Sequence, residues 1–220
     1  MRQRLRDNGL ALVLFTLFAI FLAAQSVTGW RTYNNDQVEH GEPTSSFGSY
    51  LTTGHFVEAT FENWESEFLQ MAAYVLLTVW LVQKGSSESK PPGGDAELEA
   101  DPRDQAGKGG APGPVRSGGW RLAIYEHSLS IAFTALFLMS IAMHAVGGVR
   151  EYSAEQVAHG QPPVSVGTFV TTSEFWFQSF QNWQSEFLAV GSIVVLSIFL
   201  RERGSPESKP VAASHDETGT

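Results

Sequence analysis

Apolar residues are concentrated in four stretches of the chain, and the segments between them are polar. Residues 9–29 and 128–149 each run for about 21 positions without a formal charge, close to the roughly 20 residues that a helix needs to cross a bilayer core. Two shorter apolar runs, 68–82 and 187–200, reach a comparable length only if their helices begin at Trp64 and Trp183. The pattern predicts membrane-spanning helices at about 9–29, 64–83, 126–149 and 183–201.

The second half of the chain repeats the first. The segment 61–69, Phe-x-Asn-Trp-x-Ser-Glu-Phe-Leu, recurs at 180–188, an offset of 119 residues that holds without a gap from Leu10 to Pro91. Self-similarity at a fixed spacing indicates duplication. We therefore predict an all-α membrane protein with four transmembrane helices, arranged as two tandem duplicated helical hairpins.

The hairpins are predicted to occupy residues 1–84 and 120–203. Residues 85–119 and 204–220 are rich in Gly, Pro, Ser and acidic side chains, so we expect a disordered cytoplasmic linker and a disordered cytoplasmic tail. Both segments contain Ser-x-Glu-Ser-Lys-Pro near their start, at 86–91 and 205–210. We interpret this motif as a relic of the duplication, with a short docking peptide as the alternative.

Basic residues predict the orientation. Excess Lys and Arg marks cytoplasmic flanks, and such residues flank one end of every predicted span: Arg2, Arg4, Arg6, Lys84, Arg116, Arg121, Arg201 and Arg203. Both termini are expected in the cytoplasm, in a multi-pass protein of the cytoplasmic membrane. The first apolar run resembles a secretory signal, but its repeat at 128–149 lies in the middle of the chain, which argues against cleavage.

The helices are expected to extend beyond the outer membrane face. Residues 31–40 and 150–159 contain no Pro or Gly and end at His-Gly-x-Pro, typical of a helix C-terminus. Thr52–Thr53 and Thr171–Thr172 are predicted N-caps of the following helices, and Thr171 with Glu174 fits a capping box. This extension is the part expected to carry specificity.

The candidate functional residues are those that both copies retain at and above the outer interface. For Glu67 and Glu186 three interpretations stay open: a structural clasp with Arg31 and Arg150, which we favour, a pair that binds a cation or relays a proton, and simple exposure. The full set is Arg31, Tyr33, Gln37, His40, Asn63, Trp64, Glu67, Arg150, Tyr152, Gln156, His159, Asn182, Trp183 and Glu186.

The remaining chemistry is sparse. His40 and His159 fit either a two-fold metal site or a helix-terminal cap, and the cap is favoured. His144 has Gln25 as its counterpart, so a symmetric haem or metal pair is not indicated. The asparagines are expected to bridge helices and the tryptophans to anchor at the interface. There is no cysteine and the net charge is −9, so we expect no cofactor, no metal and no nucleic-acid partner.

The repeated motif, together with Tyr-x-x-x-Gln-x-x-His-Gly-x-Pro at 33–43 and 152–162, resembles a family of small bacterial membrane proteins known only as a domain of unknown function. The resemblance covers both hairpins, without the linker or the tail. It implies a bacterial inner membrane and four spans. It implies no activity or catalytic residue.

We expect a non-enzymatic structural, accessory or partner-binding protein whose partners are the lipid bilayer and a membrane or extracytoplasmic protein. The alternative is a small proton, cation or solute conduit that uses Glu67 and Glu186. The nearly apolar inner segments 75–81 and 193–200 argue against a pore through one chain. An enzyme ranks third, because no nucleophile or metal constellation is evident.

Overall fold

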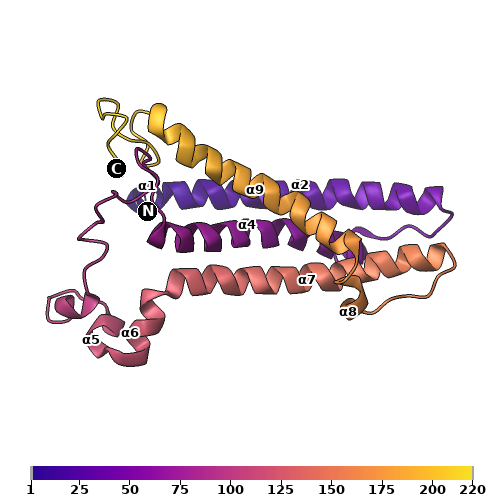
Figure 1. Cartoon of the computed structure of the whole chain (residues 1–220). Helices are drawn as coiled ribbons and strands as arrows, with labels where there is room; N and C mark the ends of the chain where they lie inside the picture. The colour runs from indigo at the N-terminus through magenta and orange to yellow at the C-terminus, as the bar shows by residue number, and fades with distance from the viewer. Residues whose placement is uncertain (1, 220) are drawn as a thin grey trace. The chain divides into compact units, whose positions relative to one another are not determined.

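The computed structural model describes residues 2–219, with the side chains of all of these except residues 2, 4 and 5. Four helices are long (Figure 1): α2 (Gly9–Glu39), α4 (Gly54–Trp80), α7 (Ser128–Ala158) and α9 (Ser173–Phe199). The short ones are α1 (Arg2–Asp7), α3 (Phe47–Tyr50), the 3-10 helix η1 (Pro102–Gln105), α5 (Gly113–Ser117), α6 (Gly119–Glu126) and α8 (Val166–Phe169). No strand occurs among residues 2–219, so the prediction of an all-α protein is confirmed.

The helices α2 and α7 continue well past their apolar segments, as predicted. Each ends in a Schellman motif around a glycine with positive φ, Gly41 or Gly160, both at 74°. The Glu42 N–H donates to the carbonyl of Gln37 over 2.7 Å, and the Gln161 N–H donates to that of Gln156 over 2.8 Å. Glycine suits this position because the left-handed backbone conformation carries no penalty without a Cβ atom.

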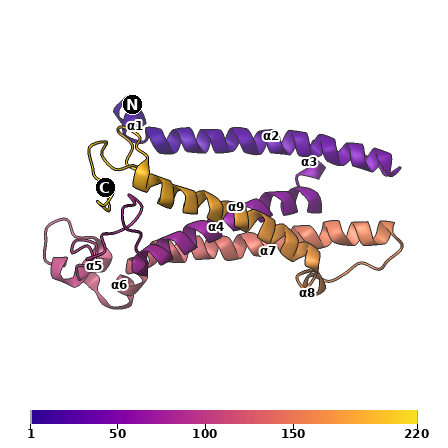
Figure 2. The same cartoon turned by 45° about the horizontal axis from the view of Figure 1, so that its top comes forward.

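The bounds of α2, α3 and α4 recur 119 residues later as those of α7, α8 and α9. The short helices α3 and α8 stand just before α4 and α9 (Figure 2). Each has a serine N-cap: Ser46 accepts from the Ser49 N–H over 3.2 Å, and Ser165 accepts from the Thr168 N–H over 3.1 Å. The backbone therefore follows the spacing of the sequence repeat.

Threonines cap the helices that follow, at one of the two predicted positions. Thr53 accepts from the Phe56 N–H and Thr172 accepts from the Phe175 N–H, each over 3.3 Å. The Thr171 hydroxyl donates to the Thr168 carbonyl over 2.7 Å. The capping box predicted from Thr171 is wrong, because α9 begins one residue later than that motif requires.

Three of the described helices are long and apolar enough to cross a membrane: α2, α7 and α9. The fourth predicted span falls on α4, which ends at Trp80. Every stretch of 18 residues within α4 consequently includes Glu65 and Glu67, and its average apolarity is lower. Only 6% of the most apolar part of α2 is buried within the protein. Leu10, Phe15 and Phe21 are 75%, 72% and 66% exposed.

The chain divides into two compact units. The first unit comprises residues up to Phe61 together with Ala142–Phe175, and the second comprises Glu62–Ile141 together with the residues from Trp176 onward. In the first unit the buried side chains include Tyr50, Phe169 and Phe175.

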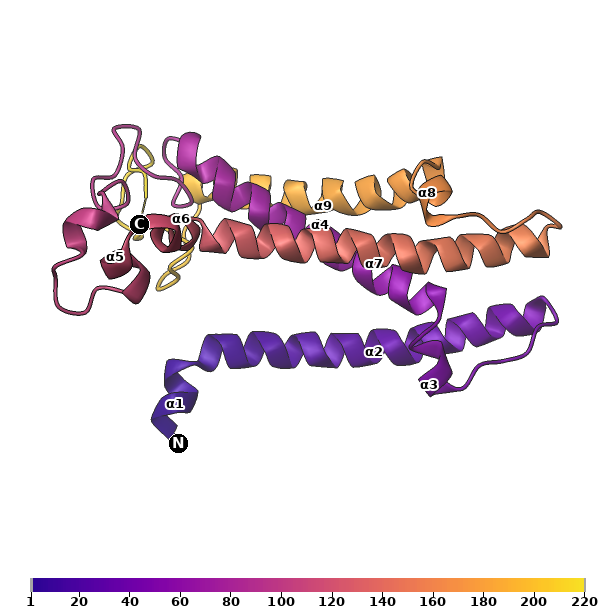
Figure 3. The same cartoon turned by 90° about the horizontal axis from the view of Figure 1, so that it is seen from below.

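In the second unit the helices α5 and α6 pack together (Figure 3) and bury Val115 and Leu122. The segment 85–119, expected to be a disordered linker, contains η1 and α5. Its disorder in solution stays a prediction.

Candidate functional site

An aromatic cluster in the first unit is built on two helix glycines. Gly29 of α2 lies against the phenol of Tyr50, and Gly148 of α7 lies against the ring of Phe169. A Cβ atom at position 148 would be 2.6 Å from Phe169 Cε1, closer than any real contact. Only glycine lets α3 and α8 bring these rings onto the long helices. Tyr50 and Phe169 are consequently 1% and 0% exposed.

The first copy carries polar groups in this cluster. Tyr33, Tyr50 and His55 form a triangle of rings whose centroids are 5.5–5.8 Å apart. The Tyr50 Oη lies 3.1 Å from His55 Nδ1. Burial, followed by the negative charge of Glu151, raises the pKa of the Tyr50 phenol, so this hydroxyl stays protonated.

A carboxylate completes this cluster. Glu151 is half-buried, interacts electrostatically with His55 and is hydrogen-bonded to the backbone of the same residue. Gly54 makes this approach feasible, because a Cβ atom there would lie 2.8 Å from the Glu151 backbone nitrogen. Chemically, the group is an imidazole that can take up or release a proton beside a carboxylate and a phenol.

The second copy has an apolar ring in place of the Tyr50 phenol, and an exposed carboxylate, Glu174, stands where the first copy has His55. Phe169 stands where the first copy has Tyr50, and it packs on Tyr152 and on Phe175 with both centroid distances at 5.5 Å. His144 is 0% exposed and stacks on Phe175 at 4.8 Å. Its counterpart Gln25 donates to the Thr60 hydroxyl over 3.5 Å. The two copies therefore share a backbone and differ in buried chemistry.

The candidate residues predicted in the outer parts of α2 and α7 lie at the surface or make hydrogen bonds at the ends of these helices. Arg31 and Arg150 are exposed, and Gln37 and Gln156 are half-buried. His40 Nδ1 and His159 Nδ1 each lie 2.9 Å from a carbonyl one turn earlier, that of Asp36 or Glu155. These are the helix-terminal contacts expected of a cap. Among the described residues no group of three or more His, Cys, Asp or Glu is placed to hold a metal ion.

Glu67 and Glu186 belong to the second unit, whereas Arg31 and Arg150 belong to the first, so the clasp stays a prediction. Glu67 is exposed, and Glu186 is half-buried and interacts with the charge of Glu67. The Gln70 amide donates to the backbone carbonyl of Glu186 over 3.3 Å.

Other motif residues use contacts within their own helices. The Asn182 amide donates to the Gln178 carbonyl over 3.1 Å. The hydroxyls of Ser66 and Ser185 donate to the carbonyls of Asn63 and Asn182 over 2.7 and 2.8 Å. Asn63 is exposed and Trp64 is half-buried.

The comparison of the two halves of the sequence did not identify Glu65 as a candidate residue. This side chain is 0% exposed, and its Oε1 accepts a hydrogen bond from Trp183 Nε1 over 3.0 Å. Position 184, its counterpart, is Gln, so a search for residues shared by both copies passes over Glu65. Its position in the helix could have indicated burial, because Glu65 lies three residues before the apolar Phe68 and therefore on the same helix face.

The two Ser-x-Glu-Ser-Lys-Pro motifs fold into equivalent loops in the second unit. The Ser89 hydroxyl accepts from the Gln83 N–H over 2.8 Å, and the Ser208 hydroxyl accepts from the Glu202 N–H over 2.9 Å. The lysines differ. Lys90 pairs with Glu99 over 2.7 Å.

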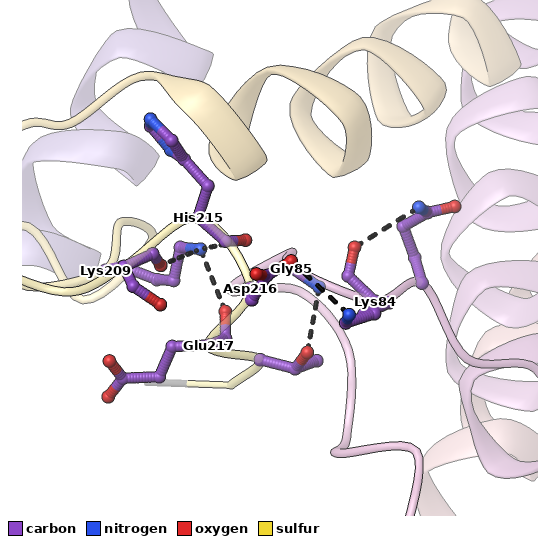
Figure 4. Close-up of polar contacts among 9 residues, drawn as sticks. Lys84, Gly85, Lys209, His215, Asp216 and Glu217 are labelled. Carbon is purple, nitrogen blue, oxygen red and sulfur yellow. Dashed lines mark hydrogen bonds and ion pairs between the residues drawn. The ribbon is translucent and has the colours of Figure 1, made fainter.

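Lys209 is 1% exposed, and its ammonium donates to three backbone carbonyls of the tail (Figure 4). The distances from Lys209 Nζ to the carbonyl oxygens are 3.0 Å for Ser214, 3.2 Å for His215 and 2.8 Å for Glu217. The tail also contacts the first loop, where the Gly85 N–H donates to the Thr218 hydroxyl over 2.8 Å.

The fold and these contacts define an all-helical protein with apolar helices compatible with a membrane. The chain belongs to the family described as Domain of unknown function (DUF6766), whose profile matches residues 1–220. The match includes 85–119 and 204–220, so the family similarity is wider than the two hairpins. No curated protein and no solved structure matches the chain.

Proposed function

We propose that this chain is an integral membrane protein that acts without enzymatic activity, as an accessory unit that binds a partner protein on the outer side of a bacterial inner membrane. The observation that carries the membrane assignment is the exposure of α2. Its charge-free segment presents large apolar side chains on all sides, which water would penalise and lipid tails would solvate.

Four spans arranged as two duplicated hairpins are part of this proposal. The recurring helix bounds support an equivalent role for α4 and α9. Leu81 and Val82, which follow α4, are apolar and exposed, and they would lengthen its lipid-facing stretch. The carboxylates of α4 would then lie near the outer interface, where their cost is lower than at the bilayer centre.

The proposed topology places both termini in the cytoplasm. A reporter active only outside the cytoplasm, fused after residue 45, is expected to be active, and the same reporter fused after residue 100 is expected to be silent. The reverse pattern would overturn the orientation.

The proposed partner surface is formed by exposed apolar residues in the extension. Val38 and its counterpart Val157 are 63% and 56% exposed, and Phe47 and its counterpart Val166 are 38% and 41% exposed. They lie beyond the apolar segments that end at residues 29 and 149, where lipid tails would not cover them. Apolar side chains that remain exposed in corresponding places of both copies are typical of a surface that a protein partner covers.

The test is crosslinking in native membranes followed by purification of the full chain. A partner recovered with the native chain is expected to be lost with Val38→Glu plus Val157→Glu. The control is Asn35→Glu, which adds a charge at an exposed polar position of α2. Equal recovery of the partner by the double variant and the control would exclude this surface.

A conduit is the second candidate, because Glu186 and Glu67 interact electrostatically. Proteoliposomes with the full chain should then pass protons or monovalent cations faster than empty vesicles, and Glu67→Gln plus Glu186→Gln should abolish the excess flux. Absence of any excess flux would exclude the conduit and leave the accessory role.

A further inference from the structure

Glu65 is a buried carboxylate in the segment proposed to cross the membrane. It is 0% exposed, and the indole of Trp183 donates to it. A buried ionisable side chain in a membrane-spanning segment is costly even near the interface, and one that faces the protein interior is a candidate functional site. Glu67, two residues later, is exposed and does not share this environment.

Two serine hydroxyls in the same unit are buried without a hydrogen-bond partner. Ser140 of α7 and Ser179 of α9 are both 0% exposed, and neither Oγ makes a hydrogen bond. Other helical serines of this chain turn back onto their own helix: Ser26 and Ser192 donate to the carbonyl four residues earlier over 2.7 Å. A buried hydroxyl without a partner is costly, so its oxygen is available to a ligand.

The helix register brings the two hydroxyls to one level beside Glu65. Trp183, which is bonded to Glu65, packs on Phe137 of α7 with ring centroids 6.2 Å apart. Ser140 follows Phe137 by three residues and Ser179 precedes Trp183 by four, which is about 4.5 and 6 Å along the helices. Because α7 and α9 run in opposite directions (Figures 1 and 3), both steps lead toward the end where α9 begins.

We propose that Glu65, Ser140 and Ser179 bind a dehydrated monovalent metal cation, for which sodium is the probe. One monovalent cation neutralises one carboxylate, and in a low-dielectric interior a neutral pair is far less costly than a net charge. Hydroxyl and carboxylate oxygens are the hard ligands that such ions accept. A proton on Glu65 would neutralise the carboxylate as well, and tryptophan emission that follows pH but not sodium would distinguish that case.

Trp183 provides the reporter for this site because its indole is bonded to Glu65. The full chain in detergent is titrated with sodium chloride against choline chloride at constant ionic strength, and tryptophan emission is recorded. We expect a saturable change with sodium and none with choline. A sodium response that survives Trp183→Phe would come from another tryptophan and would overturn this placement.

Glu65→Gln keeps one oxygen for the Trp183 N–H, removes the negative charge and replaces the other carboxylate oxygen by an amide nitrogen. It should raise the half-saturating sodium concentration by about tenfold or more, and Ser140→Ala plus Ser179→Ala should do the same. The control Glu174→Gln changes an exposed carboxylate of α9 and should titrate like the native chain. If circular dichroism shows that Glu65→Gln does not fold, the sodium titration of the double serine variant tests the proposal instead. Native-like titration of the folded variants, or emission that follows pH but not sodium, would overturn the proposal.

Discussion

The corner where α3 meets α4 and the corner where α8 meets α9 share their backbone but differ in chemistry. Each has a serine cap, a threonine cap and an aromatic ring on a helix glycine. In the first corner the ring is Tyr50, which is bonded to His55. In the second it is Phe169, which packs on the rings of Tyr152 and Phe175.

This difference separates structural residues from chemical ones. What both copies retain, such as the two glycines and the caps, holds the backbone. Three polar groups below the surface sit where the copies disagree: buried Glu65 against Gln184, buried His144 against Gln25, and half-buried His55 against Glu174. At these positions the side chains differ, while the bounds of the helices that carry them recur with the same spacing.

The largest expected effect comes from filling the space under an aromatic ring. Gly148→Ala places a Cβ atom 2.6 Å from the ring of Phe169, which is fully buried. We expect a loss of about 2 kcal/mol in the free energy of unfolding, typical of overpacking. Thermal unfolding in detergent measures it. The control is Gly191→Ala, which meets nothing within 4 Å and should be neutral or stabilising.

In the first copy, the stability lost through Gly29→Ala should be partly restored by a second substitution, Tyr50→Phe. Gly29→Ala clashes with the hydroxyl of Tyr50, while the next atom of that ring is 3.3 Å away. Tyr50→Phe removes the hydroxyl, so the double variant should lose less unfolding free energy than the sum of the losses of the two single variants. Strict additivity would show that the hydroxyl is not the obstacle.

At the other end of the molecule the two loop lysines are expected to differ as well. Lys209→Met leaves three backbone carbonyls without their buried donor, whereas Lys90→Met removes one contact with an exposed carboxylate. Charge-assisted hydrogen bonds are worth about 1.5–3 kcal/mol when buried, and surface ion pairs much less. Limited proteolysis should therefore cut residues 211–219 faster in Lys209→Met only. Equal cutting in both variants would show that Lys209 does not hold the tail.

The long helices could be predicted from the sequence, whereas the short helices α3 and α8 and the buried chemistry of the corners could not. His-Gly-x-Pro specified the ends of α2 and α7 because the glycine requirement there is local. Burial of Glu65 depends on Trp183, which is 118 positions away along the chain. Burial of Lys209 depends on how the loop that follows it folds back, which no regular pattern at residues 214–217 indicates. Periodicity also placed α4 without showing that it ends at Trp80, before its apolar run is complete.

A smaller effect is expected from converting the first corner to the chemistry of the second. Tyr50→Phe loses the hydrogen bond to His55, worth about 1 kcal/mol, and keeps the ring packing. The reverse change, Phe169→Tyr, adds a hydroxyl at a fully buried position and should also destabilise. Thermal unfolding of both variants measures these losses. A Tyr50→Phe protein as stable as the native chain would mean that the polar corner contributes nothing to the fold.

The smallest effect concerns the exposed end of α2. The hydrogen bond of His40 to the Asp36 backbone, followed by the Asp36 charge, raises the pKa of the His40 imidazole above its usual value of 6.5. A raised pKa in the folded state means that the stabilisation is complete below the unfolded pKa and is lost as the pH rises through the folded pKa. Titration of His40 by NMR should thus give a midpoint above 6.5, and Asp36→Asn should lower it while leaving the backbone contact in place. A midpoint at or below 6.5 in the native chain would contradict the contact, and an unchanged midpoint in Asp36→Asn would assign the whole shift to the backbone carbonyl.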